Sequence, residues 1–192
     1  MILIDTSRLQ KIEEELVKVP NGINKVLSSA LRDATRGAAK EVSTRIRDKY
    51  EVRSAGLIRK AVSVKMPMTT SSNMEAIVRV TGSPLRLREF KFSPRVAMTG
   101  RTRRRVKASI IAGKMDVYNN RTFTATMSNG HFGIFHRLTG KYMKGRREAI
   151  DERFGPSVAE MAGGNRVRPG VEEYFKAQFE KRLAHYLDRY GR

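Results

Sequence analysis

The sequence predicts an α+β protein in which a mainly antiparallel sheet packs against a long N-terminal helix and a C-terminal amphipathic helix. Three observations support this fold class. Apolar residues recur every three or four positions over residues 24–50 and again over 171–190, as on one face of a helix. Between these segments, several short runs alternate apolar and polar residues, which is typical of half-buried strands. This order favours helices packed on one face of a sheet.

The N-terminal part of the chain is predicted to be helical. Asp5-Thr6-Ser7 can cap a short helix that extends to Val17, and Pro20-Asn21-Gly22 ends it. The longer helix over residues 24–50 has a narrow apolar stripe whose alanine-rich middle predicts close approach by another helix or backbone. The stripe consists of Ile23, Leu27, Ala30, Leu31, Ala34, Ala38, Val42 and Ile46, and the basic residues Arg32, Arg36, Lys40, Arg45 and Arg47 lie largely off it.

The first predicted strands follow a short helical turn at Leu57 and Ile58, which Ser54 can cap. Residues 62–66 and 75–81 alternate on either side of a turn at 67–73, so we expect a hairpin. The next stretch is polar and basic and is broken by Pro94 and Gly100. We therefore expect an extended basic loop or arm over residues 91–107.

A second group of strands is predicted after this loop. Residues 105–112 and 122–127 alternate clearly, as does the segment from Phe132 to Arg137, and together they predict an antiparallel meander. Gly155, Pro156 and Ser157 then have the composition of a structural turn, with Pro156 at the start of a helix. One helical turn over 158–161 follows. The last helix has Pro169 near its first position, Glu172 and Glu173 in its first turn, and Gly191 at its end.

Length, charge and cysteine content indicate what kind of protein this is. The 192 residues suffice for a single domain over residues 1–192 with a real core. The 39 Lys and Arg residues exceed the 19 Asp and Glu residues by 20, a self-repelling excess that predicts anionic or acidic partners. The absence of cysteine excludes disulfides and thiolate metal sites, and the apolar start, Met1-Ile2-Leu3-Ile4, is too short for a signal peptide or membrane span. We expect a soluble, intracellular protein that does not bind membranes.

No pattern in the sequence points to catalysis. His131, His136 and His185 have no second histidine or carboxylate at a metal-ligand spacing, so no metal or other cofactor is expected. Ser157 lacks the following glycine of a hydrolase nucleophile turn, and Gly163-Gly164 lacks the Lys-Ser/Thr of a phosphate loop. The side chains of Asp151 and Glu152 diverge, which argues against paired-carboxylate chemistry. We therefore predict no enzyme activity and no small-molecule substrate.

Two basic clusters remain as candidate contact sites for DNA or a partner. The first contains Arg101, Arg103, Arg104, Arg105 and Lys107, and the second contains Lys141, Lys144, Arg146 and Arg147. Contacts to phosphates need only flexible cations, so the clusters predict non-specific nucleic-acid binding. A solvated face, or an arm that pairs with acidic residues of a neighbouring subunit, explains the same residues.

The order of these features resembles the bacteriophage minor tail protein Z family, also called tail completion proteins. The resemblance covers nearly the whole chain. Its signatures are the alanine-rich helix Ala30-Leu31-Arg32-Asp33-Ala34-Thr35-Arg36-Gly37-Ala38, the segment Pro84-Leu85-Arg86-Leu87-Arg88-Glu89-Phe90, the strand ending Phe135-His136-Arg137, the Gly155-Pro156-Ser157-Val158 segment and the final amphipathic helix. Glu148-Ala149-Ile150 replaces the family's usual Leu-Pro-Ile.

The resemblance implies a structural virion protein at the head-proximal end of a long non-contractile tail. It implies partners near the tail terminator and the head–tail joint: further copies in a ring, for which a hexamer is a candidate, tail tube or neck proteins, and the packaged DNA in the central channel. Assembly would take place in the host cytoplasm. The alternative from another class is a free protein that binds nucleic acid non-specifically through the cluster from Arg101 to Lys107.

Overall fold

The computed structural model describes residues 22–66, 74–97, 104–143 and 147–190. The predicted helix at the very N-terminus, the turn at 67–73 and Gly191 lie outside these ranges. In chain order the elements are α2 (Gly22–Lys49), α3 (Ala55–Ala61), β1 (Val62–Lys65), β2 (Ile77–Val80), β3 (Pro84–Arg86), η1 (Leu87–Glu89), β4 (Lys91–Ser93), β5 (Lys107–Ser109), β6 (Asp116–Val117), β7 (Thr122–Thr126), β8 (Phe132–Tyr142), β9 (Glu148–Glu152), β10 (Phe154–Ser157), α4 (Val158–Gly163) and α5 (Arg168–Tyr190).

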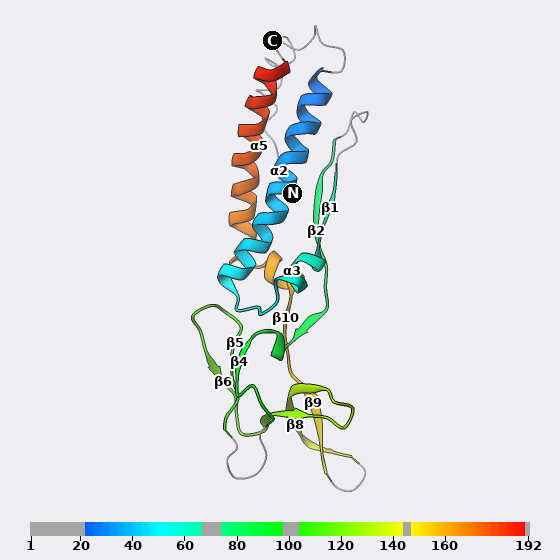
Figure 1. The fold of residues 1–192 in the computed structure, drawn as a ribbon, viewed down its shortest axis with the longest axis vertical. Helices are drawn as coiled ribbons and strands as arrows, with labels where there is room; N and C mark the ends of the chain where they lie inside the picture. The colour runs from blue at the N-terminus through cyan, green and yellow to red at the C-terminus, as the bar shows by residue number, and fades with distance from the viewer. Residues whose placement is uncertain (1–21, 67–73, 98–103, 144–146, 191–192) are drawn as a thin grey trace. The chain divides into compact units, whose positions relative to one another are not determined.

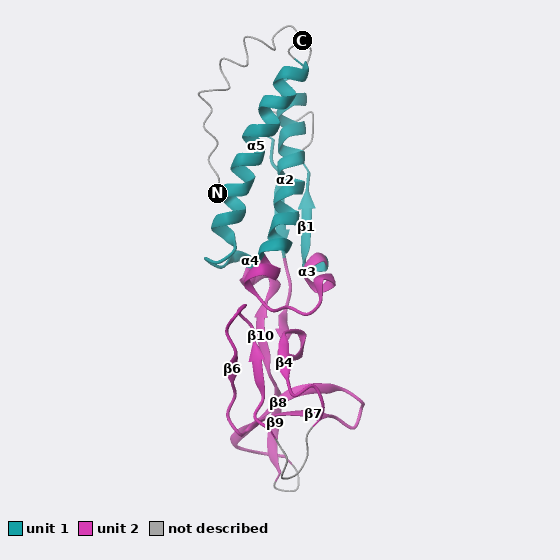
Figure 2. Cartoon of the chain, turned by 60° about the vertical axis from the view of Figure 1, so that its left-hand side comes forward, with its two compact units in different colours: residues 1–45, 60–80, 162–192 teal, residues 46–59, 81–161 magenta. Residues whose placement is uncertain are grey.

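The chain divides into two compact units, coloured separately in Figure 2. Unit 1 comprises residues 1–45, 60–80 and 162–192, and unit 2 comprises residues 46–59 and 81–161. The α+β class predicted from the sequence is confirmed, but the described strands form four small antiparallel sheets rather than one larger sheet. That residues 1–192 form a single domain stays a prediction.

The core of unit 1 forms where α2 and α5 lie side by side (Figure 1). Ala30, Leu31 and Ala34 of α2 are buried together with Phe179 of α5, which confirms the predicted close approach of a second helix to the alanine-rich stripe. The helices are so close at Gly37 that an added Cβ would lie 3.2 Å from a ring carbon of Tyr174. Small residues on α2 thus let the aromatic residues of α5 pack near its backbone.

A polar contact crosses the same helix pair. The Tyr186 hydroxyl of α5 donates a hydrogen bond to Asp33 Oδ2 of α2 over 2.9 Å, and Arg182 Nε lies 3.7 Å from the same oxygen. This hydrogen bond, together with burial and the charge of Asp33, raises the pKa of Tyr186. The helix α5 confirms the predicted C-terminal helix with Pro169 at its second position, but Glu172 and Glu173 lie beyond its first turn.

The predicted hairpin of unit 1 is confirmed. Strand β1 pairs antiparallel with β2, with Val62 opposite Val80 and Val64 opposite Val78. Met74 and Ala76, just before β2, pack against the core between α2 and α5. The hairpin therefore closes the apolar side of the helix pair, and the polar side of α2 is left to face outward.

Unit 2 contains the other three sheets. Two of them have three strands, in the orders β4-β5-β6 and β7-β8-β9, and the third pairs β10 with β3. The predicted meander is therefore wrong in one strand: β7 and β8 pair as expected, but their third strand is β9, and β5 belongs to another sheet. The loop predicted over 91–107 is likewise wrong at its ends, because β4 and β5 pair there, with Ser93 opposite Lys107.

The segment Gly155-Pro156-Ser157 is part of strand β10 and does not form the predicted turn. Strand β10 pairs with β3 through Phe154 and Ser157, and its register is irregular at Gly155 and Pro156 between them. Proline is tolerated in a strand where the ladder is interrupted, because its missing N–H is not required there. The predicted helix start at Pro156 is wrong by two residues, because α4 begins at Val158. The predicted helical turn over 158–161 is confirmed.

Candidate functional site

The sheet β4-β5-β6 presents a cationic outer face. Ser93, Lys107 and Val117 are opposite one another in a row across the three strands, and all three are exposed. In the neighbouring row, Phe92 and Ala108 are buried and Asp116 of β6 is half-buried. Because successive residues of a strand alternate between the two faces, Arg105 is expected on the same outer face as Lys107. Buried Val106 and Phe92 hold this face in place from beneath.

The structure locates part of the first predicted cluster. Arg104 and Arg105 are exposed just before β5, and Lys107 is the first residue of β5. Arg105 Nε donates a hydrogen bond to Asn120 Oδ1 over 3.0 Å, which orients its guanidinium without neutralising the charge. Arg101 and Arg103 lie outside the described residues.

The second predicted cluster lies on the other three-stranded sheet. Lys141 is exposed near the end of β8, which continues beyond the predicted strand from Phe132 to Arg137. Arg147 is exposed just before β9. Tyr142 pairs with Glu148 between them, and the residue is 66% exposed. Lys144 and Arg146 lie outside the described residues. The two clusters thus occupy different sheets of unit 2.

Charge is concentrated in unit 2. By sequence it contains 21 of the 39 Lys and Arg residues but only 8 of the 19 Asp and Glu residues, or a formal charge of +13 from the +20 of the chain. Most of these carboxylates are already engaged. Ion pairs or hydrogen bonds occupy Glu51, Glu89, Asp116, Glu148, Asp151, Glu152 and Glu160.

The cations of the two clusters that the structure describes are therefore left without a carboxylate partner among the described residues. Within the described ranges, Arg104, Arg105, Lys107, Lys141 and Arg147 form no ion pair. Unpaired cations gathered on exposed strands repel one another, and this repulsion falls when an anion binds. Such a surface suits phosphate groups or the carboxylates of another protein.

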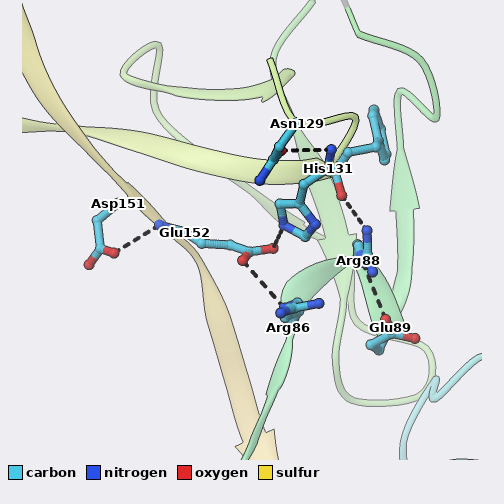
Figure 3. A network of polar contacts seen from close by, with 8 residues as sticks. Arg86, Arg88, Glu89, Asn129, His131, Asp151 and Glu152 are labelled. Atoms are coloured by element: carbon cyan, nitrogen blue, oxygen red, sulfur yellow. Dashed lines mark hydrogen bonds and ion pairs between the residues drawn. The ribbon is translucent and has the colours of Figure 1, made fainter. Parts of the chain in front are cut away.

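A polar network supports these sheets from within unit 2 (Figure 3). Glu152 of β9 has one carboxylate oxygen 3.0 Å from His131 Nε2 and the other 3.4 Å from Arg86 Nε of β3. Only 15% of the Glu152 side chain is exposed. Nearby, Arg88 pairs with Glu89 and donates a hydrogen bond to the backbone oxygen of Phe132. The network ties β3, β9 and the start of β8 together.

Gly133 makes room for this network. A Cβ on Gly133 would lie 2.8 Å from Glu152 Oε1 and equally close to the ring of Phe135, so no larger residue fits without displacing Glu152. Sequence spacing did not reveal the contact of His131 with a carboxylate, because the two residues are 21 positions apart and meet only through sheet pairing. In the part of the chain that the structure describes, no group of three or more His, Cys, Asp or Glu residues could hold a metal ion.

Ser157 has a definite structural role as the cap of α4. Its hydroxyl accepts a hydrogen bond from the Glu160 N–H over 3.1 Å, and Glu160 Oε2 accepts one from the Ser157 N–H over 2.7 Å. This reciprocal pair is a capping box, and its Ser-x-x-Glu signature is visible in the sequence. Gly155 lies under the ring of buried Phe90, where an added Cβ would be 2.7 Å from Cε2.

The family of the chain follows from a comparison with models of known protein families. The family model for prophage minor tail protein Z (GPZ) matches residues 5–192. The chain belongs to this family. No curated protein and no solved structure matches.

Membership of the minor tail protein Z family makes the chain a structural component of a bacteriophage tail. The family points to assembly contacts rather than to bond-making chemistry. Among the described helices, none is long and apolar enough to cross a membrane. For this minor tail protein, the exposed cationic sheets of unit 2 are therefore candidate surfaces for contact with other tail components or with DNA.

Proposed function

We propose that this minor tail protein completes the head-proximal end of a long non-contractile tail, next to the tail terminator and the head–tail joint. Copies of the chain form a ring around the DNA channel, with a hexamer as the candidate stoichiometry. Tail terminator, tail tube or neck proteins are the neighbours in the virion, and packaged DNA passes through the ring. The protein acts by shape and charge, without a cofactor or substrate.

The observation that carries this proposal is a group of exposed cations on unit 2 that form no ion pair within the described ranges, in a chain from a tail protein family. A ring around DNA concentrates phosphate charge at its centre, because duplex DNA carries one negative charge per about 1.7 Å of its axis. Cations on exposed strands would lose their mutual repulsion in that position. The contact candidates within the described ranges are Lys107 at the start of β5 with Arg104 and Arg105 just before it, and Lys141 of β8 with Arg147 just before β9.

Exposed apolar residues support contacts with other proteins on the same unit. Within the described ranges, the exposed large hydrophobic residues are Val96, Met115, Val117, Tyr142, Met143 and Phe154, and all belong to unit 2. Met115 and Val117 are on or beside β6, which is an edge strand of its sheet. Exposed edges and apolar residues are typical of sites that pair with another chain. A closed ring needs such heterologous contacts between neighbouring copies.

Deletion of the gene in the phage that encodes the protein tests the proposal. The expected result is tails that are present but do not join to filled heads, with joining restored by the wild-type chain supplied in trans. A chain with Arg104→Glu and Lys107→Glu should not restore joining. A matched control with Lys176→Glu and Lys181→Glu, two exposed positions of α5, should restore it.

Normal yields of joined virions from the deletion mutant would overturn the proposal. Recovery of the chain only as free protein bound to nucleic acid, with none in purified particles, would instead establish the alternative of a free non-specific nucleic-acid-binding protein. Purified particles can be checked for the chain by mass spectrometry in the same experiment.

A further inference from the structure

One surface outside the predicted clusters has an unusual distribution of charge. One side of helix α2, made of alanine and aliphatic residues, packs into the core of unit 1. The opposite side of the helix is formed by positions 25, 29, 32, 36, 40 and 43, which recur every three or four residues. These residues are Lys25, Ser29, Arg32, Arg36, Lys40 and Ser43, here called the α2 basic stripe. Lys25, Arg36 and Lys40 are exposed, and Arg32 is half-buried.

The α2 basic stripe contains no carboxylate. The two acidic residues of this part of α2 lie off the stripe and are engaged elsewhere: Asp33 by Tyr186 and Arg182, and Glu41 by Arg45 at 2.7 Å. None of the four cations of the stripe forms an ion pair with a residue that the structure describes. The positive charge of the stripe is therefore not balanced from within the described part of unit 1.

The stripe also contains no apolar residue, which distinguishes between possible ligands. The buried centre of a protein–protein interface is depleted in charged residues, Lys in particular, and is built from apolar and aromatic side chains. The α2 basic stripe cannot supply such a centre. Surfaces that bind nucleic acid are far more positively charged and need no apolar core, because release of counterions from the phosphates drives binding. The chemistry thus favours a polyanion over an acidic protein.

The geometry of a helix fits this ligand. From Lys25 to Lys40 the stripe extends for about 22 Å at 1.5 Å per residue. Duplex DNA carries about 13 phosphates over this length on its two strands together, more than the four cations of the stripe, so contact does not require a fixed register. Packing of the opposite side of α2 against Phe179 and its neighbours prevents the helix from turning the stripe away.

We infer that the α2 basic stripe is a binding site for the phosphate backbone of double-stranded DNA, without sequence preference. This inference deepens the proposed function and rests on it for the source of the DNA, which in the tail is the packaged genome. It adds a contact element in unit 1 to the candidate cations of unit 2. Lys25, Arg32, Arg36 and Lys40 are the residues that contact phosphate.

The test is the salt dependence of binding to a random-sequence DNA duplex of 25 base pairs, measured by fluorescence anisotropy with the full-length chain. The wild-type protein is compared with Arg36→Gln/Lys40→Gln. A matched control, Lys176→Gln/Lys181→Gln, removes the same charge from exposed positions of α5 that form no ion pair within the described ranges. A third variant, Arg104→Gln/Lys107→Gln, removes it from unit 2. Glutamine favours helix about as well as lysine and arginine do, so α2 and α5 should be preserved.

The expected result is a fall of about 1.8 in the magnitude of the slope of log K against log salt for Arg36→Gln/Lys40→Gln, because each phosphate that a cation neutralises contributes about 0.9 to that slope. The α5 control should keep the wild-type slope. Equal slopes for the α2 variant and the α5 control would overturn the inference, as would a decrease confined to Arg104→Gln/Lys107→Gln. Unchanged DNA binding with loss of association between copies, measured by light scattering, would assign the stripe to a protein contact and overturn it too.

Failure of the inferred DNA site on α2 and failure of the proposed function give different experimental results. Absence of the chain from purified tails would remove the tail-completion role and leave the measured slopes standing. An unchanged slope for the α2 variant would remove the DNA site on α2 and leave the position of the protein in the tail untouched.

Discussion

Replacement of Gly155 by alanine should destabilise unit 2 through one specific clash. The added Cβ would lie 2.7 Å from Phe90 Cε2 and 3.2 Å from Cζ, inside ordinary van der Waals contact, and the Phe90 side chain is fully buried and cannot swing into solvent. Forcing an extra carbon into a packed core costs about 1–3 kcal/mol. For a chain of this length, a loss of 1 kcal/mol lowers the Tm by roughly 2–4 °C, so the expected decrease is about 2–12 °C.

Differential scanning calorimetry measures this decrease. Gly163→Ala is the matched control, since an added Cβ there has no heavy atom within 4 Å and the position lies in α4, so its Tm should be unchanged or slightly raised. A second variant locates the cause. Phe90→Leu removes the ring carbons that meet the new Cβ, so Gly155→Ala should cost less in that background than in the wild type, as a non-additive pair. An unchanged Tm for Gly155→Ala, or strictly additive losses, would refute the clash.

Other interactions in the fold give three further predictions. Ser157→Ala removes the cap of α4 and should lower the free energy of unfolding by about 1 kcal/mol in a urea titration, whereas Ser157→Asp, which can still cap, should retain most of it. Glu152→Gln leaves Arg86 and His131 without their charged partner and should lower the free energy of unfolding by about 1–3 kcal/mol. Asp151→Asn, at the exposed neighbouring position, should lower it by less than about 0.5 kcal/mol. Equal losses for the two variants would contradict the role of the network. The pKa of Tyr186 is raised in the folded state, so its contribution to stability is complete below the ordinary tyrosine pKa and is lost as the pH rises through the higher folded value. Tyr186→Phe should therefore be less stable than the wild type at pH 7 by about 1 kcal/mol and should show a smaller loss of stability between pH 9 and pH 12; an identical pH profile would contradict the hydrogen bond to Asp33.

The helices could be predicted from the sequence because their signals are local. The apolar stripe from Ala30 to Ile46 repeats with the helical period, and its alanines already indicate a close neighbour. The hairpin of β1 and β2 and the pairing of β7 with β8 could be predicted for a similar reason, since each joins strands that are close in the sequence.

The remaining strand pairings could not be predicted, because alternation shows which residues face a core but not which strand lies beside them. Lys91–Ser93 pairs with Lys107–Ser109 across a stretch that is polar and contains Pro94, a composition that favours a loop. Gly155 and Pro156 have the composition of a turn, and only the irregular pairing of β10 with β3 accommodates them in a strand.

In the candidate site, too, some features could be predicted from the sequence and others depend on the fold. The cations of both clusters are visible in the sequence as basic runs. That the described members of the clusters have no carboxylate partner within the described ranges depends on where Glu51, Glu89 and Glu148 lie in the fold. The α2 basic stripe is visible as basic residues away from the apolar face. Its lack of ion pairs within the described ranges is apparent only from the fold, in which Asp33 and Glu41 are engaged elsewhere.

In the proposed function, the positive charge of this tail protein surrounds the packaged DNA at the head-proximal end of the tail. A cryo-electron microscopy reconstruction of the head–tail junction of the intact virion tests it most directly. We expect a closed ring of this chain between the tail terminator and the neck, with lysine and arginine side chains facing the DNA in the channel. Density for the chain at the distal tip of the tail, or a ring whose lumen is lined by uncharged side chains, would contradict it.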